Sequence, residues 1–315
     1  MSWWSKFLGG GTLRDWQARA TAGGVAWLIG VGALQPGWGI ALLLLAPLVV
    51  VPLALALLPA PAGRAEATLR RGVAWLQLPA ALVLFGAAAA NPGIAAALCA
   101  VPWFCCTALL ALVGGLRLKA SQAEWCADVG LLYLAIGGGW LMLSALGARP
   151  LDFSTEIVRA TATHFHYAGL VLPLLAGRTA RTCSSRLSRA AAICIVVGVP
   201  LVAAGITLSA FGVRQPELLA AWFLAGASIV LAACQLSVAV RMGGLASLLL
   251  SVSGLSLIAG MILAMLYSLG RALGADWLDI PLMLRTHGVI NAFGFALPGL
   301  LAWNLVCRLR LSEKR

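Results

Sequence analysis

The sequence is poor in charged residues. Only 10% of its 315 residues are Asp, Glu, Lys or Arg, and 62% are hydrophobic. A soluble globular protein usually carries about 25% charged residues, so this composition excludes a surface that mostly faces water. Apolar stretches recur from Thr21 to Cys307, and crossing a bilayer takes roughly 20 apolar residues per helix. Lipid is therefore the expected solvent.

The alternation of apolar and polar residues that a membrane β-barrel requires is also missing. Runs rich in Ala and Leu favour helices instead, and a helix satisfies its own backbone hydrogen bonds in lipid. The expected fold is all-α, a polytopic transmembrane helix bundle of about ten spans with kinks at the prolines inside them. The expected spans are residues 21–35, 38–58, 72–90, 94–116, 124–146, 155–176, 190–213, 217–240, 244–270 and 280–307.

Three regions are expected along the chain. Residues 1–20 mix Trp and Phe with Lys and Arg, which predicts an interfacial amphipathic segment. Residues 21–307 form a single transmembrane helical domain, and residues 308–315 a basic cytoplasmic tail. No cleaved signal peptide is expected, because the first span can serve as the targeting signal.

The formal net charge of +12 has the distribution of a membrane protein. With the N-terminus inside, 17 Lys and Arg residues fall in segments expected in the cytoplasm and five on the opposite side. This bias follows the positive-inside rule. It predicts a multi-pass protein of the bacterial inner membrane with both termini cytoplasmic, and it argues against nucleic acid as a partner.

Several catalytic signatures are absent. The sequence contains no Gly-x-Ser-x-Gly turn, no phosphate-binding loop and no pair of aspartate-rich motifs. Three histidines are too few for the histidine boxes of membrane desaturases. A regular helix does not aim both residues of His-x-His at one ion, so neither a metal nor another cofactor is expected. The eight cysteines lie mostly in apolar stretches, and no disulfide is expected.

Polar residues inside the apolar stretches concentrate in the sixth expected span. At about 100° per residue, His164 points away from the face that carries His166. Glu156 and Arg159 are spaced to pair, and such a pair would orient or charge a histidine deeper in the span. The alternative for each histidine is a structural hydrogen bond between helices. The polar face comprises Asp152, Glu156, Arg159, Thr163, His166 and Tyr167.

The tenth expected span carries the remaining histidine. His287 and Asn291 are four residues apart and therefore stacked on one face. Aligned on their prolines, residues 166–173 and 291–298 share the pattern His/Asn-x-x-Gly-x-x-Leu-Pro. At a rise of 1.5 Å per residue, the three histidines and Asn291 lie about 11–17 Å inside a hydrocarbon layer about 30 Å thick. We expect spans six and ten to meet and line one cavity at mid-bilayer.

A third polar group lies near the start of the fifth expected span. Glu124 and Asp128 are one helical turn apart, with Arg117 and Lys119 close in sequence. An interfacial ion pair is the expected role of Glu124. Asp128 lies deeper, and both pairing and substrate binding remain open for it.

Two functions of different classes fit these residues. The first is a membrane enzyme that performs acid-base chemistry, such as ring opening, cyclisation or isomerisation, on an apolar or lipid-like small molecule. His166 and His287 are the leading proton carriers. The candidate catalytic residues are His166, His287, His164, Glu156 and Asn291, and the candidate substrate-binding residues are Arg159, Thr163, Tyr167 and Asp128.

The alternative is a proton-coupled small-molecule transporter. Ten spans divide into two units of five, as in transporters with inverted repeats, and buried His and Glu can carry coupling protons. Against this reading, the first five spans contain no histidine. A structural or assembly subunit is a third possibility, and the oligomeric state stays open.

Two segments carry a family resemblance. Residues 163–169, with the sequence THFHYAG, and His287-Gly288 followed by Asn291-Ala292 and Gly294 resemble the YndJ-like family of bacterial multi-pass membrane proteins. The resemblance implies a multi-pass fold with a histidine-rich intramembrane region. Members are sometimes described as transporters, and the resemblance implies no particular reaction.

Overall fold

The computed structural model describes residues 12–120, 124–275 and 277–312, and within these ranges the chain is helical with no β-strand. The expected all-α polytopic bundle is confirmed. The chain divides into two compact units. Unit 1 comprises Met1–Pro150, Ser154–Val171 and Cys307–Arg315, and unit 2 comprises Leu151–Phe153 and Leu172–Val306.

Eight helical segments in the described part of the chain are long and apolar enough to cross a membrane. Each corresponds to one expected span. The two other expected spans, 21–35 and 155–176, fall in helices that carry more polar residues, so the count of ten and the cytoplasmic termini stay predictions. The eight segments are Trp38–Leu55, Arg64–Ala89, Ile94–Ala120, Trp125–Leu146, Arg186–Ala210, Gln215–Arg241, Gly244–Leu273 and Ile280–Leu309.

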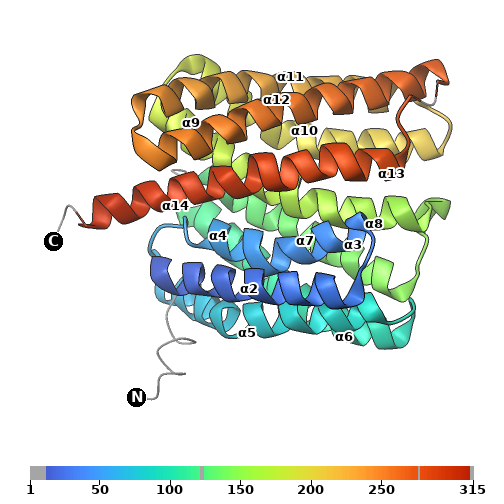
Figure 1. Ribbon diagram of the computed structural model, residues 1–315, viewed down its shortest axis with the longest axis horizontal. Helices are drawn as coiled ribbons and strands as arrows, with labels where there is room; N and C mark the ends of the chain where they lie inside the picture. Colours follow the sequence, from blue (N-terminus) through green and yellow to red (C-terminus); the bar gives the residue numbers. More distant parts are fainter. Residues whose placement is uncertain (1–11, 121–123, 276, 313–315) are drawn as a thin grey trace. The chain divides into compact units, whose positions relative to one another are not determined.

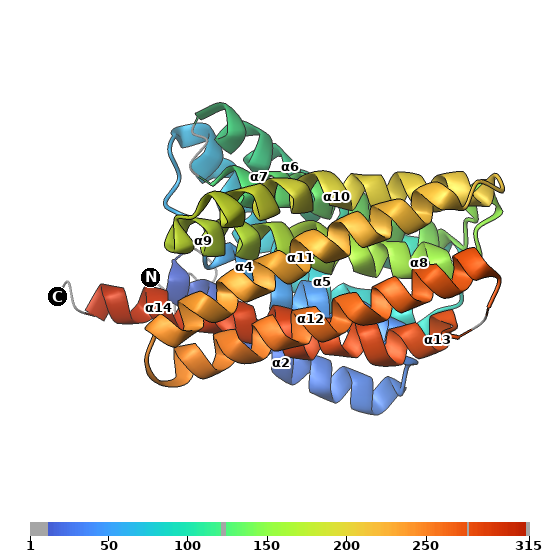
Figure 2. The same cartoon turned by 90° about the horizontal axis from the view of Figure 1, so that it is seen from above.

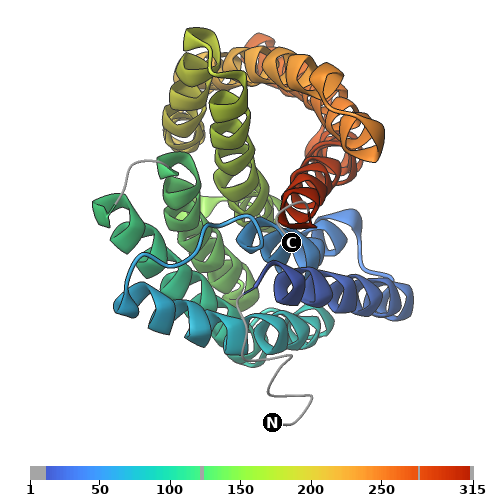
Figure 3. The same cartoon turned by 90° about the vertical axis from the view of Figure 1, so that its left-hand side faces the viewer.

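Unit 1 is built around three long helices that pack in sequence order. α5 packs on α6, α6 packs on α7, and α7 then packs on the sixth expected span (Figures 1 and 3). The elements of unit 1 are α2 (Leu13–Leu34), α3 (Trp38–Leu45), η1 (Ala46–Val50), α4 (Val51–Leu55), α5 (Arg64–Ala89), α6 (Ile94–Ala120), α7 (Trp125–Leu146), α8 (Thr155–His164) and η3 (Phe165–Val171).

Unit 2 repeats this order of packing. α10 packs on α11, α11 packs on α12, and α12 then packs on the tenth expected span (Figure 2). After the short 3-10 turn η2 (Pro150–Asp152), the elements are α9 (Leu172–Cys183), α10 (Arg186–Ala210), α11 (Gln215–Arg241), α12 (Gly244–Leu273), α13 (Ile280–Met283), η4 (Leu284–Gly288), η5 (Ile290–Ala296) and α14 (Leu297–Ser312), with unit 2 ending inside α14 at Val306.

Three π-helical segments stand directly before prolines. η1, η3 and η5 are each followed by an α-helix whose second residue is Pro52, Pro173 or Pro298, respectively. A proline has no N–H to close the helical ring, and its side chain displaces the preceding turn. A π-helical segment is one way in which a helix absorbs this disturbance. The motif shared by spans six and ten therefore has the same local backbone in both.

Side chains replace hydrogen bonds that the prolines around η1 cannot make. A proline leaves the carbonyl four or five residues earlier without its helical donor. The Tyr167 hydroxyl donates to the Leu42 carbonyl, five residues before Pro47, at 2.9 Å. Gln77 Nε2 donates to the Pro47 carbonyl, five residues before Pro52, at 2.8 Å. The candidate substrate-binding Tyr167 is thus a buried residue whose hydroxyl group bonds to α3, the helix directly before η1.

The ends of the expected regions differ from the sequence-based boundaries. α2 runs without a break from Leu13 to Leu34, through the boundary expected at residue 20. Trp16 and Arg19 are buried in unit 1, and the Arg19 guanidinium donates to the Ala74 carbonyl and lies over the Trp16 ring. This part of the expected interfacial segment is packed against protein, and residues 1–11 lie outside the described residues. α14 likewise continues past residue 308, to Ser312.

Candidate functional site

His166 lies in η3 and is completely buried in unit 1. Trp103 Nε1 donates to its Nε2 at 3.0 Å, and its Nδ1 lies 2.7 Å from the Ala162 carbonyl oxygen. An indole only donates and a carbonyl only accepts, so the ring is neutral with its hydrogen on Nδ1. A Cβ at Gly137 of α7 would lie 2.9 Å from Nδ1. Both ring nitrogens are bonded within unit 1, and this geometry favours a structural role.

The other candidates of the sixth span do not assemble around His166. Glu156 is exposed at the start of α8, about 15 Å along the helix from His166. Its Oε1 accepts a hydrogen bond from the Thr155 hydroxyl at 3.1 Å, instead of an ion pair with Arg159. The Thr163 hydroxyl donates to the Arg159 carbonyl at 3.0 Å. The polar face extends over several turns, so this geometry does not support a direct contact between Glu156 and a deeper histidine, and the orienting role of Glu156 stays a prediction.

His164 is half-buried, whereas His166 is fully buried, which agrees with their placement on different faces. Within the described ranges, no three His, Cys, Asp or Glu side chains gather in a way that could hold a metal ion. All eight cysteines are free thiols in the structure.

His287 lies in η4 of unit 2, one residue before its end at Gly288, and is half-buried. Its Nδ1 lies 2.8 Å from the Gly260 carbonyl oxygen of α12. Because a carbonyl only accepts, Nδ1 carries the hydrogen, and in the neutral ring Nε2 keeps a lone pair. Nε2 has no hydrogen-bond partner in the part of the chain that the structure describes. The lone pair on Nε2 is thus an available proton acceptor.

Asn291 lies one turn beyond His287 on the same face, as the spacing predicts. Its Nδ2 donates to the His287 carbonyl at 2.8 Å, which fixes the orientation of the amide. A Cβ on Gly260 would lie 2.6 Å from Nδ2 and 2.9 Å from Oδ1 of Asn291. A Cβ at this position of α12 would therefore displace the amide, and Gly260 both anchors the imidazole and makes room beside it.

His166 and His287 belong to different units. That they line one cavity at mid-bilayer stays a prediction. Each has its own partners inside its unit, so each site can be tested separately.

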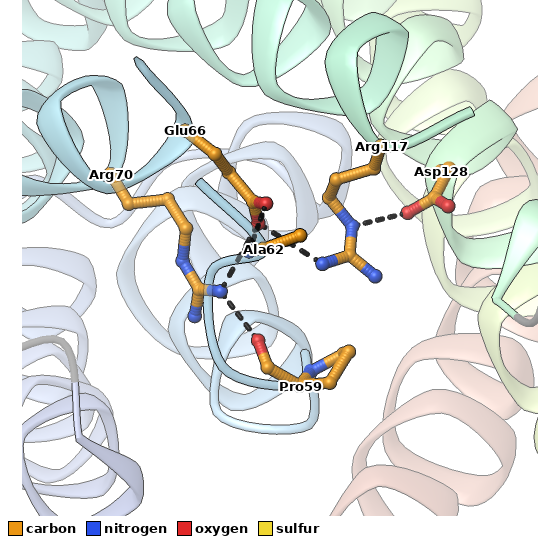
Figure 4. A network of polar contacts seen from close by, with 6 residues as sticks. All are labelled: Pro59, Ala62, Glu66, Arg70, Arg117 and Asp128. Atoms are coloured by element: carbon orange, nitrogen blue, oxygen red, sulfur yellow. Dashed lines mark hydrogen bonds and ion pairs between the residues drawn. The ribbon is translucent and has the colours of Figure 1, made fainter. Parts of the chain in front are cut away.

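Four charged side chains form a buried network at one end of α5, α6 and α7 (Figure 4). Arg117 is central: its Nε lies 2.5 Å from Asp128 Oδ1, and its Nη1 lies 3.0 Å from Glu66 Oε1. Arg70 Nη1 lies 3.5 Å from Glu66 Oε1 and donates to the Pro59 carbonyl at 2.5 Å. All four charged residues are buried.

Sequence reasoning missed most of this network. Arg70 and Arg117 are among the 17 Lys and Arg residues assigned to cytoplasmic segments, and Glu66 was not among the candidate residues. The spacing of Glu66 and Arg70, four residues apart at a helix start, is the signal that could have found one edge. The two roles left open for Asp128 are resolved in part, because its Oδ1 is paired with Arg117.

Comparison with known proteins identifies the family. The family model described as YndJ-like protein matches residues 41–295, which include η3 and His287. The chain is also 30% identical over 212 residues to the membrane protein YndJ of Bacillus subtilis (strain 168), covering 65% of this chain and 38% of that protein. The chain thus spans well under half the length of this relative. No solved structure matches. As the residues of spans six and ten predict, this multi-pass membrane protein belongs to the YndJ-like family.

Proposed function

We propose that the protein is an enzyme of the bacterial inner membrane that performs acid-base chemistry on an apolar or lipid-like small molecule. His287 Nε2 is the proton acceptor in this proposal. The observation that carries it is the anchoring of Nδ1 on the Gly260 carbonyl, which leaves the Nε2 lone pair available in an apolar helix bundle. Imidazole changes charge near neutral pH, and ionisable groups inside membrane spans are functional candidates by default.

Asn291 supplies the second polar group. One N–H of its amide is bonded to the His287 carbonyl, and the other can donate to an oxygen on which negative charge develops. His287 would take a proton from a carbon or hydroxyl of the substrate and return it at another position. Such a transfer isomerises or cyclises a molecule without an oxidant or a reductant, and it needs no group that the site lacks.

The test uses exchange of the transferred proton with solvent. Membranes from cells that express the protein are incubated in D2O, and the apolar extract is analysed by mass spectrometry. We expect a product that carries solvent deuterium and disappears in His287→Gln, because Gln retains a donor for the Gly260 carbonyl but has no basic nitrogen. Cys194→Ala is the matched control for expression. Deuterated product that persists in His287→Gln would refute the proposal, as would the absence of any product that depends on the protein.

Proton-coupled transport is the second candidate function. The observation that favours it is the repeated π-helical backbone before Pro173 and Pro298, because internal repeats with interrupted helices are typical of transporters. If the protein is a transporter, adding the substrate should drive proton flux into vesicles. The substrate should then leave the vesicles without deuterium in its carbon skeleton. The same D2O experiment therefore distinguishes the two candidates.

A further inference from the structure

The buried network of unit 1 holds its two carboxylates unequally (Figure 4). Glu66 accepts hydrogen bonds on both oxygens, from Arg117 and Arg70 on Oε1 and from the Ala62 backbone N–H on Oε2. Asp128 accepts one, from Arg117 Nε on Oδ1. Its Oδ2 is buried and has no hydrogen-bond partner among the described residues, although Asp128 is 0% exposed.

This inequality decides where a proton would bind. A buried polar atom without a partner costs free energy, and the cost is larger for a charged group. Both oxygens of Glu66 already accept hydrogen bonds, whereas Oδ2 of Asp128 has room for a proton and no donor facing it. A proton that enters the network therefore has its free acceptor at Asp128.

The charged neighbours of Asp128 agree with this assignment. Arg117 of α6 attracts its negative charge, whereas Glu66 of α5 and Glu124, the residue that caps the start of α7, repel it. η3 packs on α7 at Gly130, where it presents the backbone carbonyls of Gly169 and Leu170. Gly130 is two residues from Asp128 and points about 200° around the helix from it, so the charged groups that act on the Asp128 carboxyl group are Arg117, Glu66 and Glu124.

We propose that Asp128 is a proton-binding site, with Oδ2 as the atom that takes the proton. The proton comes from water, and the network of Glu66, Arg70, Arg117 and Asp128 changes from neutral to a net charge of one. The charge attraction between Asp128 and Arg117 ends, while Arg117 stays paired with Glu66. Proton binding thus weakens the link between α6 and α7 and leaves the link between α5 and α6 in place. This proposal does not depend on the one made for His287.

Infrared difference spectroscopy tests the proposal directly. Spectra of the purified full chain in lipid vesicles are recorded between about pH 4 and pH 9, a range that covers the ordinary titration of carboxyl groups and the upward shifts seen on burial. The other carboxyl groups of the chain also protonate at low pH, so each variant is compared with the unchanged protein. We expect one component of the carbonyl band, which moves in D2O, to be lost in Asp128→Asn and kept in Glu66→Gln. Identical spectra for the unchanged protein and Asp128→Asn would overturn the proposal.

Two further measurements keep the test decisive. If Asp128→Asn does not fold, Asp128→Glu replaces it: the carboxyl group moves by one methylene, so the band should shift in frequency and remain. An unshifted band in Asp128→Glu would assign it to another residue and refute the proposal. Replacing K⁺ by Na⁺ should leave the spectra unchanged, and a difference that follows Na⁺ instead of pH would show that Oδ2 binds a cation.

Discussion

His166 in unit 1 and Asn291 in unit 2 occupy the same position of one repeated motif. Each lies second in a seven-residue π-helical segment followed by Leu-Pro. Each also packs against a glycine of the preceding long helix, His166 against Gly137 and Asn291 against Gly260. Sequence pattern, backbone and packing partner therefore agree between the two regions.

The two regions differ in which ring nitrogen atoms of the histidines lack a hydrogen-bond partner among the described residues. Trp103 and Ala162 take both nitrogens of His166, and no ring atom remains for a ligand. In unit 2 the histidine stands one turn earlier, at His287, and only its Nδ1 is taken. The same framework thus holds a closed site in unit 1 and an open one in unit 2. The motif sets the backbone, and side chains on neighbouring helices decide whether a site is available.

The largest expected effect separates the two histidines by activity. His287→Gln should lower the rate of formation of the deuterated product by roughly 10²–10⁴-fold, the usual contribution of a general base. His166→Gln should leave the rate per folded molecule within a few-fold of the unchanged protein. Product formation is measured per amount of folded protein, with Cys194→Ala as control. Equal losses in both variants would remove the distinction between an open and a closed site.

The next largest effect is expected when the site at His166 is made more like the site at His287, with one ring nitrogen left without a partner. Trp103→Phe removes the donor to His166 Nε2 and leaves a buried acceptor without a partner, which should destabilise the protein by about 1–3 kcal/mol. Thermal unfolding in detergent measures the loss. In ¹⁵N NMR spectra of the three histidines, the ring nitrogens of His166 should show the Nδ1–H form in the unchanged protein. In Trp103→Phe the Nε2 signal of His166 should shift. An unchanged His166 signal would mean that Trp103 does not hold Nε2.

Adding one methyl group to each glycine tests the shared packing. Gly137→Ala and Gly260→Ala place a Cβ 2.9 Å from His166 Nδ1 and 2.6 Å from Asn291 Nδ2, respectively. Overpacking costs about 1–3 kcal/mol, and about 1 kcal/mol of helix propensity offsets it. We expect a net loss near 1 kcal/mol in thermal unfolding for both. Gly260→Ala should also lower activity, whereas Gly137→Ala should not. Gly32→Ala, where a Cβ meets nothing within 4 Å, is the control.

The smallest effect tests whether the two motifs run the same way through the membrane. Cys183 ends the helix after Pro173, and Cys307 lies in the helix after Pro298. A membrane-impermeant thiol reagent should label single-cysteine variants of both from the cytoplasmic side. Labelling from opposite sides would refute the parallel orientation.

The rate of labelling at Cys183 carries a separate expectation. Hydrogen bonding with Ser185, whose Oγ lies 3.7 Å from Sγ, lowers the pKa of the Cys183 thiol. The thiolate therefore persists to lower pH than in an ordinary thiol, whose pKa is about 8.5. Labelling should begin at lower pH than that of a small thiol and should slow a few-fold in Ser185→Ala.

Local patterns accounted for the helices and for part of the site. Apolar run length predicted the eight segments that the structure supports, and the spacing of four residues correctly stacked His287 and Asn291. Contacts between helices were beyond such patterns. Trp103 lies 63 residues from His166 in sequence, and the network of Arg117 joins residues from three helices. Periodicity gives the direction of a side chain around its own helix, but not the neighbour that it meets.

The hydrogen bond between Tyr167 and the Leu42 carbonyl joins residues 125 apart in sequence. At 5–20 residues per second, about 6–25 s of synthesis separate the two groups on the ribosome. Until Tyr167 has been synthesised, the Leu42 carbonyl lacks this donor, and lipid supplies none. The packing of α3 in unit 1 is therefore completed only after η3 has emerged.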